Sequence, residues 1–202
     1  MANGCRSARE FLKDYPKELV LKDGTGVTLN PLMREDKDAL FEMFTRLSED
    51  ELWFLNHDVS DRNLIDSWVD NLDIERVISL VARLEGKIIG NAVLMRKRYG
   101  AKSHIGKIRV SVDPAFRGKR LATWMLLELV NLAISLGLRL LVMRLVQDRD
   151  FHIINEVKKL DFREQAVLEH YVMDREQNPH NLVIMTKRLA QEWEGVQDAP
   201  HL

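Results

Sequence analysis

The stretch that decides the fold reads Ile108-Arg109-Val110-Ser111-Val112-Asp113-Pro114-Ala115-Phe116-Arg117-Gly118-Lys119-Arg120-Leu121-Ala122. Apolar and polar residues alternate up to Val112, which predicts a strand with one buried face. The strand ends at Asp113-Pro114, a loop with three cations follows, and an apolar helix begins directly after it. A helix N-terminus offers unpaired N–H groups and the positive end of its dipole. The sequence therefore predicts a phosphate cradle here, suited to a pyrophosphate.

The same stretch resembles the signature of the GNAT superfamily, the acyl-coenzyme A dependent N-acetyltransferases, usually written V-x-V-x-P-x-x-R-G-x-G-x-G/A. The residues that match in register are Val110, Val112, Pro114, Arg117, Gly118 and Ala122. Arg120 stands where the family normally has its second glycine. The resemblance implies an N-acetyltransferase that uses acetyl-coenzyme A (acetyl-CoA) as its acyl donor.

In that family, backbone amides of the loop wrap the pyrophosphate, and the edge of the preceding strand pairs with the pantetheine arm. An N–H group of the same edge would serve as the oxyanion donor. The resemblance implies cofactor contacts at Val110, Val112, Arg117, Gly118, Lys119, Arg120, Leu121 and Ala122. Arg120 leaves two alternatives, because its side chain either obstructs the phosphate or folds outward and binds it as a bidentate donor.

A second family element, N-x-x-A-I-x-L-Y-x-x-L-G-F, aligns when its last residue is placed on Phe162. Asp150 then replaces the asparagine, Val157 the tyrosine and Asp161 the glycine. Many members use that tyrosine to protonate the departing thiolate, which Val157 cannot do. His104 is the candidate general base, since its ordinary pKa lies near neutrality. The other interpretation of His104 is an ordinary polar residue that follows a turn.

Composition excludes some classes of function. The 202 residues carry 30 Lys and Arg against 31 Asp and Glu, a net charge of −1, which gives no bulk attraction to nucleic acid or an anionic membrane. Cys5 is the only cysteine, so an intrachain disulfide and a thiolate metal cluster are excluded, and we predict no metal site. No apolar run approaches the ~20 residues that span a bilayer. The first residues lack the apolar core of a signal peptide, so we expect a cytoplasmic protein.

The periodicity of apolar residues predicts a mixed α/β (α+β) fold, and the order of its elements resembles that of the GNAT superfamily. Its central sheet has about seven strands and is flanked by about four helices. The predicted strands are Val27–Leu32, Val77–Leu84, Lys87–Met95, His104–Val112, Leu138–Val146, Gln165–Met173 and Leu182–Leu189. The predicted helices begin after Arg34, cover Asp61–Leu72 and Lys119–Leu136, and follow an N-cap at Asp148 or Asp150. We expect an N-terminal arm or helix over residues 1–20, one domain over 21–190 and a frayed tail over 191–202.

Three functions stay open at this point. The first is an N-acyltransferase that moves acetyl from acetyl-CoA to an amine by direct transfer in a ternary complex. Its acceptor is a protein lysine, an N-terminus or a small amine, and the sequence does not identify which; a homodimer is also open. The second is an acyl-coenzyme A binding or sensing protein with little turnover, suggested by Arg120, Val157 and Asp161. The third is an oligomeric scaffold whose loop leaves phosphate unbound.

Overall fold

The computed structural model describes residues 7–55 and 57–189. These residues form one eight-stranded sheet in the order β1-β2-β3-β4-β5-β6-β8-β7. Neighbouring strands are antiparallel except for β5 and β6, which run parallel. The strands are β1 (Lys17–Val20), β2 (Gly26–Pro31), β3 (Val77–Leu84), β4 (Lys87–Arg96), β5 (Ile105–Val112), β6 (Leu140–Val146), β7 (Arg163–Met173) and β8 (Pro179–Arg188).

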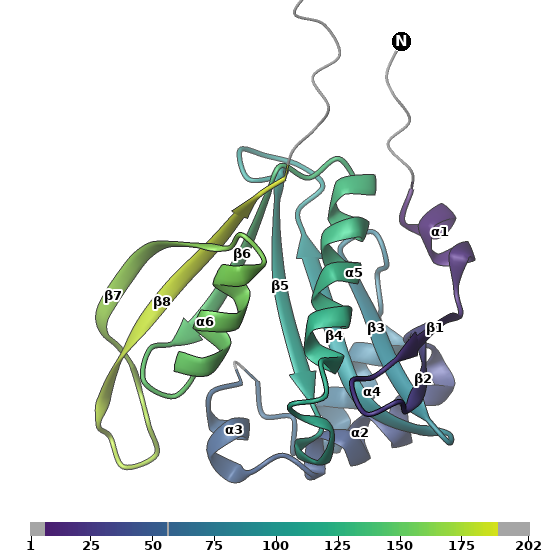
Figure 1. The fold of residues 1–202 in the computed structure, drawn as a ribbon, viewed down its shortest axis with the longest axis horizontal. Coiled ribbons are helices and arrows are strands. Elements are labelled where there is room, and N and C mark those ends of the chain that lie inside the picture. The colour runs from purple at the N-terminus through teal and green to yellow at the C-terminus, as the bar shows by residue number, and fades with distance from the viewer. Residues whose placement is uncertain (1–6, 56, 190–202) are drawn as a thin grey trace, which may run out of the picture.

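Helices cover both faces of the sheet (Figure 1). The described α-helices are α1 (Ala8–Phe11), α2 (Lys37–Thr45), α3 (Glu49–Trp53), α4 (Arg62–Asp70), α5 (Leu121–Ser135) and α6 (Phe151–Lys159). Short 3₁₀ turns are η1 (Leu12–Asp14), η2 (Arg34–Asp36) and η3 (Pro114–Phe116). Helices α1, α5 and α6 pack on one face, and α2 and α4 pack on the other.

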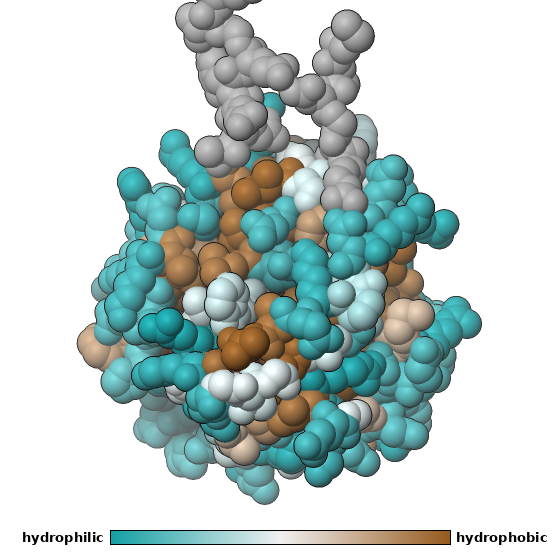
Figure 2. Space-filling view, turned by 45° about the vertical axis from the view of Figure 1, so that its right-hand side comes forward, coloured by the Kyte–Doolittle hydropathy of each residue, from teal (hydrophilic) through white to brown (hydrophobic). Residues whose placement is uncertain are grey.

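Side-chain alternation along the strands separates the two cores. Leu80 and Ala82 of β3 lie in the core under α5, whereas Val81 between them lies in the core with α2 and α4. Helix α5 is apolar on nearly all sides, and Trp124, Leu127 and Ile134 remain exposed on it. Figure 2 looks onto this side of the molecule and shows apolar residues gathered in the middle of the face, with polar residues around them.

The structure confirms the predicted fold class and adds elements that the sequence pattern did not indicate. Strand β1 is one of them, and it extends the sheet by pairing with β2. Helix α1 lies within the stretch expected to be an N-terminal arm or helix, and it buries Ala8 and Phe11 in the main core. Helix α3 was not predicted, because five residues are too few to show helical periodicity. The tail predicted over 191–202, like Cys5, lies outside the described residues.

Candidate functional site

The parallel strands β5 and β6 are joined over only part of their length. Their pairing runs from Ile105↔Leu140 to Lys107↔Val142 and then stops. Beyond Lys107 the two strands diverge (Figure 1). On its other side β5 stays paired with β4 as far as Val112. From Val110 onward, β5 therefore has an open edge that faces the divergence.

The register with β4 decides which residues direct their main-chain groups to this open edge. The N–H of Asp113 donates to the carbonyl of Ile89 at 3.0 Å, so these two residues form a hydrogen-bonded pair. Hydrogen-bonded and non-hydrogen-bonded pairs alternate along an antiparallel ladder. Ser111 and Arg109 therefore bond to β4, while Val110 and Val112 direct their N–H and C=O groups away from it. Both predicted strand contacts thus face the divergence.

The loop after β5 is firmly held at its start. The Asp113 side chain is buried, accepts from the N–H of Ala115 at 3.0 Å and forms an ion pair with Arg46. Gly118 and Arg120 both take left-handed backbone conformations, with φ of +72° and +67°. Glycine adopts this conformation without strain, which explains the family's glycine at the position of Arg120. An arginine there costs about 1–2 kcal/mol of backbone strain.

Helix α5 begins at Leu121, directly after this loop, and its N-cap residue Arg120 makes no side-chain cap hydrogen bond. The first N–H groups of a helix have no partner within it. The N–H groups of Leu121, Ala122 and Thr123 therefore point out of the helix end, where the helix dipole favours an anion. The later start of α5, two residues after the predicted Lys119, follows from the left-handed conformation of Arg120.

The three loop cations have different partners. Arg117 forms an ion pair with Glu51, and its guanidinium also donates to the carbonyl of Val112 at 3.2 and 3.3 Å. Lys119 pairs with Asp23 at 2.9 Å. Arg120 is exposed and forms no ion pair with any described residue. Of the three cations, Arg120 therefore keeps its charge available to a ligand.

Helix α3 connects the loop after β5 to the end of β7. Glu51 pairs with Arg117, and although burial raises the pKa of Glu51, the N–H of Ser48 and the charge of Arg117 hold it below its usual range. At the other end of α3, the Trp53 indole N–H donates to the carbonyl of Met173 at 2.7 Å, at the end of β7. Helix α3 therefore lies across the diverging ends of β5 and β6 (Figure 1).

The structure does not bring His104 to this region. It is exposed and precedes the first residue of β5, and its carbonyl accepts from the N–H groups of Arg139 and Leu140 at 2.9 and 3.2 Å. This is the end at which β5 and β6 are joined. His104 lies eight positions before Val112, about 26 Å of extended strand. The placement favours the other interpretation, an ordinary polar residue beside a turn.

Replacing His104 with alanine is therefore expected to leave the rate of acetyl transfer within about threefold of the wild-type value, since a general base contributes roughly 10²–10⁴. Steady-state release of free thiol at saturating amine measures this. A loss of about 100-fold, with the fold intact by circular dichroism, would restore His104 as a base.

The second family element keeps Leu160 and Phe162 but departs from the family pattern at Asp150, Val157 and Asp161. Val157 is buried in the core on α6 and offers no proton. Asp161 has a φ of +63°, the left-handed region in which the family has glycine and which aspartate adopts more readily than most residues. Asp150 is buried, and its carboxylate accepts from the N–H of Val146 at 2.8 Å, which fastens the turn between β6 and α6.

Sequence reasoning missed three residues beside the divergence: Arg109, Arg149 and His180. They come from β5, from the turn after β6 and from β8, and each contacts Phe54, which follows α3. The imidazole of His180 lies between Asp148 and Asp174. Hydrogen bonds and ion pairing with Asp174, then Asp148, raise its pKa. No local sequence pattern indicates this cluster, because the fold alone brings the three segments together.

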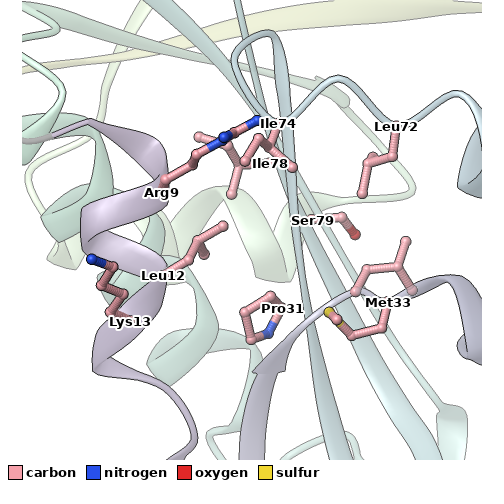
Figure 3. Close-up of a pocket in the computed structure, with 10 residues that line it drawn as sticks. Arg9, Leu12, Lys13, Pro31, Met33, Leu72, Ile74, Ile78 and Ser79 are labelled. Carbon is pink, nitrogen blue, oxygen red and sulfur yellow. The ribbon is translucent and has the colours of Figure 1, made fainter.

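The described residues also form two adjoining cavities near the N-terminus, of about 300 and 470 Å³. Figure 3 shows the first, which η1, the end of β2 and the start of β3 line with mostly apolar side chains. Neither cavity includes a residue predicted to contact the cofactor. No group of three His, Cys, Asp or Glu side chains in the described part of the chain is placed to hold a metal ion. Within residues 7–55 and 57–189, no helix has the length and apolar character needed to cross a bilayer.

Solved structures with the same fold include acetyltransferases. A ribosomal-protein-alanine N-acetyltransferase from Brucella melitensis has a TM-score of 0.71 and 21% identity, over 80% of this chain and 99% of that one. A putative acetyltransferase from Salmonella typhimurium, solved with its cofactor acetyl-CoA, has a TM-score of 0.69 and 20% identity, over 83% and 96%. A GNAT-family acetyltransferase from Streptococcus pneumoniae has a TM-score of 0.70 and 19% identity, over 80% and 99%.

Sequence comparison supplies the family. None of the curated proteins matches the chain. The family model described as "Acetyltransferase (GNAT) family" matches residues 37–162. This match begins at α2 and ends just after α6, so it contains the divergence of β5 and β6, the loop of Arg117–Ala122 and the start of α5. The chain therefore belongs to the acetyltransferase (GNAT) family.

Proposed function

We propose that the protein transfers an acetyl group from acetyl-CoA to an amine, by direct transfer in a ternary complex. One observation carries the proposal. The open main-chain groups of Val110 and Val112 lead, through a loop in left-handed conformations, to the uncapped N-terminus of α5. A peptide-like arm and a pyrophosphate need hydrogen-bonding partners in this order. The Salmonella protein of the same fold was solved with acetyl-CoA, which supports this choice of donor.

The residues present fit this donor. The N–H groups of Leu121, Ala122 and Thr123 would hold the pyrophosphate, and the guanidinium of Arg120 would add a charged donor beside them. The C=O of Val110 and the N–H of Val112 would pair with the amides of the pantetheine arm. Arg117 occupies the carbonyl of Val112 and contributes by holding the loop against Glu51.

The chemistry requires little from side chains. A neutral amine attacks the thioester carbon, a C–N bond forms and the C–S bond breaks, while the amine proton passes to water. The N–H of Val110 would stabilise the developing charge on the carbonyl oxygen. The leaving thiol has a pKa of about 8.5, so its thiolate departs near neutrality without an acid, in keeping with an apolar residue at Val157.

The test is release of free thiol from acetyl-CoA across a library of amines, with product acetylation confirmed by mass spectrometry. Protein lysines, protein N-termini and small amines form separate arms. Thiol release that depends on the amine supports the proposal. Tight binding of acetyl-CoA by calorimetry, with no thiol released in any arm, would favour an acyl-coenzyme A sensor instead.

Arg120→Asn is expected to weaken acetyl-CoA binding by about 1.5–3 kcal/mol, the contribution of a hydrogen bond to a charged group. Asparagine tolerates the left-handed backbone, so the loop is preserved while the charge is removed. Because one fewer cation contacts phosphate, the dependence of affinity on salt should also flatten. Calorimetric titration at two salt concentrations measures both effects.

Lys119→Gln is the matched control, since Asp23 already neutralises that lysine, and its effect on affinity should be smaller. Arg120→Lys keeps the charge but loses the planar fork and should fall between the wild type and Arg120→Asn. Tighter binding by Arg120→Asn would show that the arginine obstructs the phosphate.

A further inference from the structure

Two guanidinium groups converge on one residue beside the divergence of β5 and β6. Arg109 of β5 donates to the carbonyl of Phe54 at 3.3 Å. The guanidinium carbon of Arg149, in the turn after β6, lies 5.0 Å from the centre of the Phe54 ring. One arginine thus comes from each of the two diverging strands, and both face the segment that follows α3.

These two positive charges share little compensation. Arg109 is half-buried and forms no ion pair with the described side chains. Burial lowers the pKa of Arg109, the charge of Arg149 lowers it further, and Asp150 opposes both. Arg149 is exposed and forms an ion pair at 3.5 Å with one oxygen of Asp150, whose other oxygen accepts from the N–H of Val146. Arg109 has no carboxylate partner among the described side chains, and a guanidinium partly removed from water without one is costly, so its position is suited to an anion supplied from outside.

The two other carboxylates near Phe54 already have a partner, the imidazole of His180. Asp148 and Asp174 contact opposite nitrogens of the His180 ring, at 3.3 and 3.1 Å. Both carboxylates raise the pKa of that imidazole, and its ring centroid lies 6.1 Å from that of Phe54. Phe54 therefore contacts two guanidinium groups and one imidazole, and the imidazole has both of its ring nitrogens matched by carboxylates.

The position of Arg109 relates this cluster to the reaction. Its chain neighbour Val110 packs its side chain against the core under α5. Successive side chains of a strand point to opposite faces, so Arg109 lies on the other face, toward Phe54. Because Arg109 and Val110 are neighbours in the chain, an acceptor that approaches the N–H of Val110 from the α3 side would come near Arg109.

We propose that Arg109 and Arg149 bind an anionic group, a carboxylate or a phosphate, carried by the amine acceptor. This inference rests on the proposed acetyl transfer and narrows its acceptor to an amine with a negative group a few bonds from its nitrogen. Guanidinium groups suit both anions, because their planar fork matches paired oxygens. A polyamine without an anionic group would meet only repulsion here.

Matched acceptor pairs test the proposal. One arm compares the protein L-amino acids with their α-carboxamides, a second compares phosphoethanolamine with ethanolamine, and spermidine represents a polycation. The anionic member of a pair should be used with a kcat/KM about tenfold or more above its neutral partner. Arg109→Gln and Arg149→Gln should each reduce this preference by raising the KM of the anionic member. Arg98→Gln, an exposed arginine in the turn between β4 and β5, is the matched control.

Calorimetric titration of the same pairs into coenzyme A-saturated protein separates this inference from the proposed function. Stronger binding of the anionic members, lost in Arg109→Gln, supports the anion site even where no thiol is released, in which case acetyl transfer fails alone. Turnover of neutral amines or spermidine at rates equal to the anionic members overturns the anion site and leaves acetyl transfer standing. An acid-to-amide preference that Arg109→Gln does not change, or no binding of any anionic member, also overturns it.

Discussion

Replacement of Val110 by proline is expected to lower kcat for acetyl transfer by about 100-fold, the cost of removing one donor to a developing oxyanion. Proline lacks the N–H group. Because that group of Val110 faces the divergence and not β4, its loss breaks no hydrogen bond of the ladder. The protein should therefore stay folded while the reaction slows. Thiol release gives kcat, and urea unfolding followed by circular dichroism gives the free energy of unfolding.

Two variants serve as controls for this result. Val110→Ala keeps the N–H and should retain activity close to wild type. Ser111→Pro removes an N–H that the ladder requires and should unfold the protein at much lower urea than Val110→Pro. Wild-type kcat in Val110→Pro would show that this main-chain group takes no part in the reaction.

Asp113→Ala should lower the free energy of unfolding by about 3 kcal/mol, because it removes the buried partner of Arg46 and the acceptor for the N–H of Ala115. The carboxylate fixes the start of the loop, so the variant should also bind acetyl-CoA less tightly. Urea denaturation measures the first effect through the linear dependence of unfolding free energy on urea, and calorimetry the second.

The control for stability is Asp70→Ala, which breaks the more exposed pair of Asp70 with Lys37 and should cost no more than about 1 kcal/mol. Asp113→Asn keeps an oxygen for Ala115 and should fall between the two. If Asp113→Ala lowers the free energy of unfolding no more than Asp70→Ala does, the loop is held by other contacts.

The sequence predicted the parts of the molecule whose signals are local. Alternation up to Val112, the break at Pro114 and the apolar run after Arg120 define a strand, a loop and a helix within fifteen residues, and they were found in that order. The signature also located the main-chain groups of Val110 and Val112, whose direction the register with β4 then determines.

Other features depend on contacts between distant segments, which no local pattern reports. The pairing of Arg117 with Glu51 joins residues 66 positions apart and gives α3 its place across the diverging strands. His104 is a candidate general base because of its ordinary pKa. Its distance from the divergence, however, depends on the point at which β5 and β6 separate. The convergence of Arg109 and Arg149 on Phe54 likewise appears only when the sheet is assembled.

The groups assigned to the donor are nearly all peptide N–H and C=O groups, and this has a consequence for how the protein can evolve. Any substitution that preserves the alternating hydrogen bonds between β5 and β4, and the left-handed turn before α5, leaves those groups in position. Selection on donor binding then acts on backbone shape more than on residue identity, which leaves positions such as Val157 free to drift. Proteins of this fold that share only 19–21% of their residues with this chain are the expected result.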